Sequence, residues 1–138
     1  MKPSQLVKPK KPYTDLSSQP AVEAMMTANG PSAVIDFWAP WCAPCKAVAP
    51  HFEAVARSYA EQPVAFYKVN TEAQPAIAAA FGIQSIPTMV FVHRGEVLDV
   101  SVGALDSRRL ADKVEWLLSK ARGEGFFSRL FGKRKRQA

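Results

Sequence analysis

Residues 33–58 read AVIDFWAPWCAPCKAVAPHFEAVARS, and this stretch decides the fold. It begins with a continuous apolar run, Ala33–Trp38, that holds a single acid. Such a run is typical of a strand in the middle of a sheet, buried on both faces. From Cys45 to Tyr59 the apolar residues recur at helical spacing, and we expect Pro50 to kink this helix. The pattern therefore predicts a buried strand followed directly by a helix.

The only two cysteines of the chain, Cys42 and Cys45, lie where this strand gives way to the helix. The first turn of a helix presents unpaired backbone N–H groups and the positive end of the dipole, which stabilise an anion. A thiol there loses its proton more readily, and the thiolate is the form that attacks disulfides. We expect Cys42 to be the attacking sulfur because it lies at the very end of the helix, nearer solvent. Cys45 lies one turn further in, close enough to close a small ring with Cys42.

Two other interpretations of the cysteine pair compete with a redox role. A zinc site would need two more ligands, and the chain offers only His51 in the helix and His93 at a strand end. Two inert core cysteines are the second alternative, and the Trp-Cys-x-Pro-Cys spacing directly after a strand argues against it. We therefore predict a redox-active pair and no metal site.

The rest of the chain alternates strands and helices. Arg94-Gly95 predicts a tight turn that joins the last two strands into an antiparallel hairpin, while the earlier strand–helix–strand units favour parallel pairing. The predicted fold class is α/β, a mixed central sheet with a parallel core and a carboxy-terminal hairpin, flanked by helices. Further strands are expected over residues 13–16, 64–69, 88–92 and 97–102, and further helices over 20–26, 76–81 and 105–120.

The 138 residues carry a formal net charge of +6, and almost all of the excess lies at the two ends. Residues 1–15 hold four Lys and one Asp, and residues 122–138 hold six Lys or Arg and one Glu, whereas residues 16–121 are slightly acidic. We therefore expect a basic, Pro-rich arm over 1–15, one domain over 16–121 and a basic tail over 122–138. Because no apolar run approaches a membrane span or an export signal, we expect a cytoplasmic protein.

Residues 33–56 together with residues 66–105, FYKVNTEAQPAIAAAFGIQSIPTMVFVHRGEVLDVSVGAL, resemble the thioredoxin family. The likeness covers about residues 20–120 and is greatest to the bacterial thioredoxin-2 type. It implies a thioredoxin fold. Two features depart from the family. The dipeptide between the cysteines is Ala43-Pro44 where thioredoxins usually have Gly-Pro, and no cysteines remain to build the amino-terminal zinc module of some thioredoxin-2 proteins.

The resemblance also implies roles for other residues. Asp36 matches the buried acid of the family, and a carboxyl in apolar surroundings has a raised pKa that lets it exchange a proton near neutral pH. Lys68 matches the lysine beside that acid; a strand-end Asp facing water and a surface lysine are the alternatives. Ile86-Pro87-Thr88 matches the cis-proline loop that faces the cysteines. The implied docking surface for substrates consists of Trp41, which is expected to shield the cysteines, with Ala43, Pro44, Ile86, Pro87, Gly103 and Ala104.

The function implied is thiol–disulfide exchange that reduces disulfides in protein substrates. Its redox group is the Cys42–Cys45 pair itself, with no added cofactor, and a thioredoxin reductase-like donor regenerates the dithiol of a monomeric protein. A redox-inactive adapter or chaperone-type module that uses the apolar docking surface is the alternative from another class. An oxidase or isomerase fits less well because those proteins usually have histidine between the cysteines.

The last residues, 123–138, read GEGFFSRLFGKRKRQA and fall outside the thioredoxin pattern. Phe126, Phe127, Leu130 and Phe131 recur on one face of a short helix, and a basic cluster, residues 133–136, follows them. Such a segment fits an anionic membrane surface at the inner face of the membrane, or an acidic partner or nucleic acid. The glycines in this segment favour a third alternative, a disordered solubilising end.

Overall fold

The computed structural model of the chain describes residues 11–131, with side chains up to residue 123. Within these residues one five-stranded sheet has the order β1-β3-β2-β4-β5. Strands β1 and β2 both run parallel to β3, whereas β4 is antiparallel to β2 and β5 is antiparallel to β4. The strands are β1 (Thr14–Asp15), β2 (Ser32–Trp38), β3 (Val64–Asn70), β4 (Thr88–His93) and β5 (Glu96–Val102).

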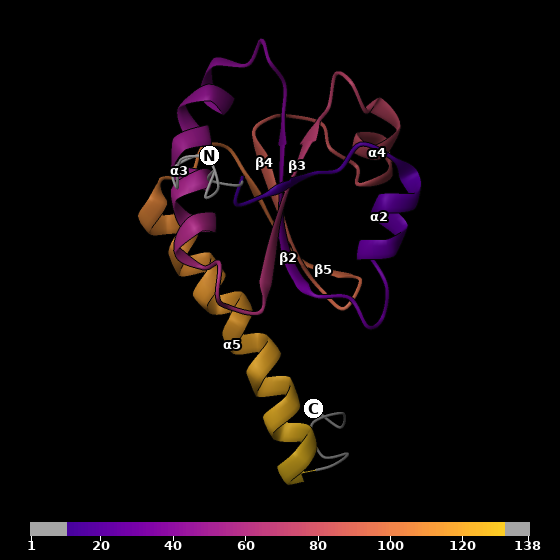
Figure 1. The fold of residues 1–138 in the computed structure, drawn as a ribbon, viewed down its shortest axis with the longest axis vertical. Helices are drawn as coiled ribbons and strands as arrows, with labels where there is room; N and C mark the ends of the chain where they lie inside the picture. Colours follow the sequence, from indigo (N-terminus) through magenta and orange to yellow (C-terminus); the bar gives the residue numbers. More distant parts are fainter. Residues whose placement is uncertain (1–10, 132–138) are drawn as a thin grey trace, which may run out of the picture.

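Helices cover both faces of this sheet. The helices α3 and α5 lie on one face and α2 and α4 on the other (Figure 1). Ser18 caps α2 by accepting a hydrogen bond from the N–H of Ala21, and Gly82, with φ of +69°, follows α4 as the predicted helix stop. The helices are α2 (Gln19–Met25), α3 (Ala43–Ser58), α4 (Pro75–Ala80) and α5 (Ser107–Phe131).

The central strand β2 confirms the prediction of a strand buried on both faces. Val34 packs into a core cluster with residues of α3 and α5, while Ile35 and Phe37 pack into a second cluster with residues of α2 and α4. Because side chains alternate across a strand, Asp36 lies on the same face as Val34, toward α3. The two-sided core therefore explains how one acid comes to lie inside an otherwise apolar strand.

The helix expected over residues 105–120 is longer than predicted. It begins at Ser107 and runs without a break to Phe131, through Gly123 and Gly125. Glycine weakens a helix by roughly 1 kcal/mol relative to alanine but does not end it, and no proline follows in this stretch. The end of α5 projects away from the sheet (Figure 1). Residues 1–10 of the predicted arm and the basic cluster, residues 133–136, lie outside the described residues.

The paired lengths of the two edge strands differ, and one face of β5 is exposed. The predicted strand over 13–16 contains only two paired residues, in β1, whereas β5 has the length expected. On β5 the side chains of Val97, Val100 and Val102 are exposed, by contrast with the buried valines of the adjoining β4.

In the part of the chain that the structure describes, no helix is both long and apolar enough to cross a membrane.

Truncation of the core side of α5 tests this packing. We expect Leu117→Ala to lower the free energy of unfolding by about 2–5 kcal/mol, because Leu117 is fully buried and its loss leaves a cavity. Leu98→Ala, on the rim of β5 where the side chain is 38% exposed, should cost less than about 1 kcal/mol. Urea unfolding of the oxidised proteins, followed by circular dichroism, measures both losses. Equal losses in the two variants would contradict the packing described.

Candidate functional site

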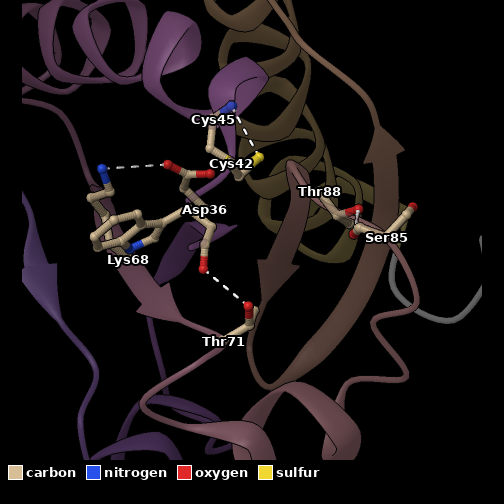
Figure 2. The surroundings of a disulfide bond; sticks show 8 residues. Asp36, Cys42, Cys45, Lys68, Thr71, Ser85 and Thr88 are labelled. Atoms are coloured by element: carbon tan, nitrogen blue, oxygen red, sulfur yellow. Dashed lines mark hydrogen bonds and ion pairs between the residues drawn. A yellow bond between two sulfur atoms is a disulfide. The ribbon is translucent and has the colours of Figure 1, made fainter. Parts of the chain in front are cut away.

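The two cysteines lie at the start of α3, in the position that the sequence predicts. Cys42 is the residue that caps the helix, and its Sγ accepts a hydrogen bond from the backbone N–H of Cys45 at 3.2 Å. The two side chains form a disulfide, with the Cα atoms 5.2 Å apart (Figure 2). A helix N-terminus thus directs an amide hydrogen at the sulfur of Cys42, which favours negative charge on that atom when the pair is reduced.

The difference in solvent exposure between the two cysteines is small. Cys42 is 5% exposed and Cys45 is 3% exposed, so both are buried. They pack in a small cluster with Ala39, Trp38 and Ile86. Because the two cysteines are buried to a similar degree, Cys42 is distinguished by its position as the helix cap and by the hydrogen bond that its sulfur accepts from the Cys45 N–H.

The two tryptophans near the cysteines differ in exposure. The side chain of Trp41 is 67% exposed, whereas Trp38 is partly buried and packs against the cysteine cluster. The shielding expected of Trp41 stays a prediction. The carbonyl of Trp38 accepts hydrogen bonds from the hydroxyl and the N–H of Thr71, at 3.1 and 2.8 Å. Trp41 stands instead on the outer surface beside the disulfide, where a partner could cover it.

Asp36 and Lys68 are paired in the interior. They are direct partners in the register of β2 and β3, and the Oδ2 of Asp36 lies 3.7 Å from the Nζ of Lys68. The side chains are only 1% and 10% exposed, which rules out both a water-facing aspartate and a surface lysine. In the view of Figure 2 the carboxylate lies between the Lys68 ammonium and the cysteine pair.

The carboxyl of Asp36 is set up to hold a proton. Burial raises the pKa of Asp36 to about 6, against the opposing influence of the Lys68 ammonium. Its second oxygen, Oδ1, is buried and has no hydrogen-bond partner among the described residues, so no donor there stabilises the ionised carboxylate. A group with this pKa exchanges protons near neutral pH, as general acid–base chemistry demands.

The loop before β4 and the loop after β5 meet next to the disulfide. The Ile86-Pro87 peptide bond is cis, as the resemblance implies, and Ile86 packs against the cysteine cluster. The carbonyl of Pro87 accepts a hydrogen bond from the N–H of Gly103 at 2.8 Å, and Gly103 has a φ of +102° that favours glycine. Ala104 follows on the surface. Pro87 itself is buried, so it fixes the loop while Ile86 faces the cysteines.

These loops and the first turn of α3 surround the disulfide with small or apolar side chains. Ala43 and Pro44 are exposed at the start of α3, and Ile86 and Gly103 are partly exposed. Of the predicted docking residues outside α3, Ile86 packs against the cysteine cluster and Gly103 is hydrogen-bonded to the neighbouring Pro87, while the docking role of the set stays a prediction.

Two aromatic residues that sequence reasoning did not assign to the site lie against Lys68. The ring of Tyr13 has its centroid 5.2 Å from the ammonium of Lys68, and the ring of Phe52 lies 5.9 Å from it. Phe52 reads in the sequence as an ordinary core residue of a helix. Tyr13 reads as part of a short edge strand, and its contact depends on how β1 aligns with β3. No sequence signal would have identified either residue.

The histidines weighed as zinc ligands have other partners. The Nδ1 of His51 accepts a hydrogen bond from the N–H of Ser107 at 3.0 Å, which helps to begin α5, and lies 2.7 Å from the hydroxyl of Ser107. The Nδ1 of His93 lies 3.0 Å from the hydroxyl of Ser32. Each histidine thus ties together two segments of the fold.

Comparison with known proteins agrees with this geometry. The family model described as thioredoxin matches residues 17–116. The chloroplastic M-type thioredoxin of Spinacia oleracea is 43% identical over 86 residues, which are 62% of this chain and 47% of that protein. Thioredoxin 1 of Synechococcus elongatus is 43% identical over 82 residues, 59% of this chain and 76% of that protein.

Solved structures support the same conclusion. The crystal structure of Malassezia sympodialis thioredoxin matches with a TM-score of 0.67 at 34% identity, covering 81% of this chain and 92% of that one. The chain spans about half the length of the chloroplastic relatives. The closer likeness to the thioredoxin-2 type stays a prediction. By the match to the family model, which covers most of its residues, the chain belongs to the thioredoxin family.

Proposed function

We propose that this protein is a thiol–disulfide oxidoreductase that reduces disulfide bonds in other proteins. The observation that carries the proposal is the hydrogen bond from the Cys45 N–H to the Cys42 sulfur at the start of α3. Family membership supports it. The redox group is the cysteine pair itself, with no added cofactor, and the protein acts as a monomer.

The reaction proceeds by two exchanges of sulfur. The Cys42 thiolate attacks one sulfur of the substrate disulfide, that bond breaks, and the other substrate sulfur leaves as a thiolate that takes up a proton. Cys45 then loses its proton and attacks the sulfur of Cys42, which releases the second substrate thiolate. Two electrons pass to the substrate, and the protein is left with the Cys42–Cys45 disulfide seen in the structure. A thioredoxin reductase-like donor of two electrons restores the dithiol.

Asp36 supplies the base for the second exchange. Its carboxylate takes the proton of Cys45 in our proposal, because a pKa of about 6 leaves it largely ionised at neutral pH yet basic enough to accept a proton. Lys68, 3.7 Å away, stabilises the ionised form between turnovers.

The docking surface recognises substrate through shape and apolar contact. Trp41, Ala43 and Pro44 are exposed beside Cys42, and Ile86 covers the cysteines from the opposite loop. Small side chains let a substrate backbone approach the sulfur closely, and the exposed Trp41 ring offers a large apolar contact. We propose that the remaining members, Pro87, Gly103 and Ala104, hold the shape of this surface.

Serine variants of the two cysteines test the redox assignment. We expect Cys42→Ser to reduce insulin no faster than dithiothreitol alone, because the attacking thiolate is gone. The variant should fold, since serine is a favoured helix cap. Cys45→Ser should accumulate a mixed disulfide through Cys42, visible by non-reducing electrophoresis. Ala47→Ser, exposed on the same helix, is the control with unchanged activity. A wild-type protein that does not accelerate insulin reduction would instead support the redox-inactive adapter.

Asp36→Asn tests the buried carboxyl through the pH dependence of stability. The pKa of Asp36 is about 6 in the folded protein against an ordinary 3.8, so the folded state binds the proton more tightly. The stabilisation by protonated Asp36 is thus complete below about pH 4 and is lost as the pH rises through about 6. Relative to Asp36→Asn, the free energy of unfolding of the wild type should fall by ~3 kcal/mol over this window. A difference in the free energy of unfolding between the wild type and Asp36→Asn that stays constant over this pH window, measured by urea unfolding, would contradict the raised pKa of Asp36.

We further propose that residues 123–138 hold the protein at the cytoplasmic face of an anionic membrane. The continuous helix α5 extends to Phe131, beyond Leu118, the last buried side chain among the described residues of this helix. The sequence of this segment combines four large apolar residues with the basic cluster, residues 133–136. The cytoplasmic leaflet is the anionic one, and each base near it contributes ~1 kcal/mol. The reducing activity proposed above also fits the compartment where thiols stay reduced.

Vesicle flotation tests the membrane contact. We expect the full chain to float with vesicles that contain phosphatidylserine, and expect recovery to fall at least tenfold when residues 123–138 are removed. A variant with glutamine at all four positions of 133–136 keeps the apolar residues and should bind weakly, because the charge attraction is lost. Equal recovery of the full and shortened chains would refute the membrane contact. If the full chain binds nucleic acid or an acidic protein but not the vesicles, those partners would be favoured instead.

A further inference from the structure

The ammonium of Lys68 is enclosed by three aromatic rings from different parts of the fold. The ring centroids of Trp38, Tyr13 and Phe52 lie 4.9, 5.2 and 5.9 Å from its Nζ. All three distances are within the ~6 Å at which the face of a ring attracts a cation. With the Asp36 carboxylate at 3.7 Å, the ammonium is held by one acid and three rings and is only 10% exposed as a side chain.

Tyr13 is the wall of this enclosure that comes from the edge of the sheet. Phe52 is fully buried in the core cluster under α3, and Trp38 packs against the cysteines. Tyr13 lies just before the two-residue edge strand β1 and is only partly buried. Its place follows from the register of β1, in which Asp15 lies opposite Lys68 and the N–H of Leu16 donates to the carbonyl of Lys68 at 2.9 Å.

We propose that Tyr13 is a positioning residue for the buried ion pair, holding the Lys68 ammonium against the Asp36 carboxylate through its ring. Without that ring the long Lys68 side chain gains a path to water on the side of β1, and the distance to Asp36 is no longer confined. The short strand β1 thereby controls the charge environment beneath the cysteines. The positioning of Lys68 does not depend on the proposed function. Only an effect of Tyr13 on the rate of disulfide reduction rests on it.

Other charged groups near this site have partners of their own. Lys11 lies 5.6 Å from the Tyr13 ring and forms an ion pair with Asp15 at 3.3 Å. On α3, Glu53 forms an ion pair with Arg57 at 3.1 Å. The cysteines of α3 carry no titratable thiol in the oxidised protein. Lys68 on β3 is therefore the charge whose position decides how Asp36 titrates in the disulfide form.

The direction of the effect follows from what the Tyr13 ring covers. The ring covers the lysine, while Asp36 is buried on β2 between the sheet and α3. Loss of the ring thus weakens the attraction of the cation for the carboxylate more than it admits water to the carboxylate. The Lys68 ammonium stabilises the ionised form of Asp36. An ammonium that is held less closely therefore makes Asp36 harder to ionise and moves its titration midpoint upward.

Substitutions of Tyr13 test this in the oxidised full-length protein, with the Asp36 midpoint read by carboxyl-carbon NMR. We expect Tyr13→Leu to raise the midpoint by about one pH unit, a tenfold change in the protonation equilibrium. Tyr13→Phe should leave it unchanged because the ring remains. Tyr59→Leu is the matched control: it removes another partly buried tyrosine from the same core cluster, away from Lys68, and should lower stability without moving the midpoint.

A double substitution shows whether the effect passes through the lysine. In a Lys68→Met background, Tyr13→Leu should cause no further shift of the midpoint. A midpoint that is unchanged or lower in Tyr13→Leu, or a shift that persists without Lys68, would overturn the proposal. The pH profile of insulin reduction is the separate readout for turnover. If the NMR midpoint moves and this profile does not, Tyr13 positions Lys68 as proposed and it is the catalytic role of Asp36 that fails.

Discussion

One hydrogen bond, from the amide of Cys45 to the sulfur of Cys42, depends on how a buried strand meets a helix. Strand β2 ends at Trp38, and α3 begins at Ala43 with Cys42 as its cap. The start of any helix has amide hydrogens without partners inside the helix, and here a thiol takes the place of the usual hydroxyl or carboxylate. The chemistry of the sulfur is therefore a property of the junction between two elements of the fold.

The same strand places a carboxyl under that junction at a cost in stability. Asp36 occupies a position in β2 whose neighbours on both faces are fully buried apolar residues. A valine there would pack without an unpaired oxygen, whereas the carboxyl leaves Oδ1 without a partner among the described residues. Sites of function commonly keep such unfavourable groups. The rings and the lysine around Asp36 limit the cost because they offer a nearby cation while excluding most of the water.

Much of this arrangement follows from the sequence. The features that do not follow from it have one physical reason in common: they depend on contacts between segments and not on neighbours in the chain. The apolar run Ala33–Trp38 predicted the central strand because burial on both faces leaves no polar alternation. The spacing of Cys42 and Cys45 predicted that the cysteines lie at the start of a helix, because a helix start depends on residues that are close together in the chain. The contact of Tyr13 with Lys68 could not be predicted, since it depends on the alignment of two strands far apart in sequence. The difference in burial between Trp38 and Trp41 could not be predicted either, because both lie within a few residues of the cysteines and the turn between strand and helix decides which ring faces inward.

The length of α5 has a geometric consequence for anything that binds its far end. From Leu118, the last buried residue described on this helix, to Phe131 the backbone continues for thirteen residues, which at 1.5 Å per residue is about 20 Å. The amino-terminal end of α3 and the carboxy-terminal end of α5 lie at opposite ends of the molecule (Figure 1). The helix thus sets the cysteine pair at a distance from anything bound at its far end, so a protein held by its last residues would meet substrate disulfides in the surrounding water and not those at the binding surface.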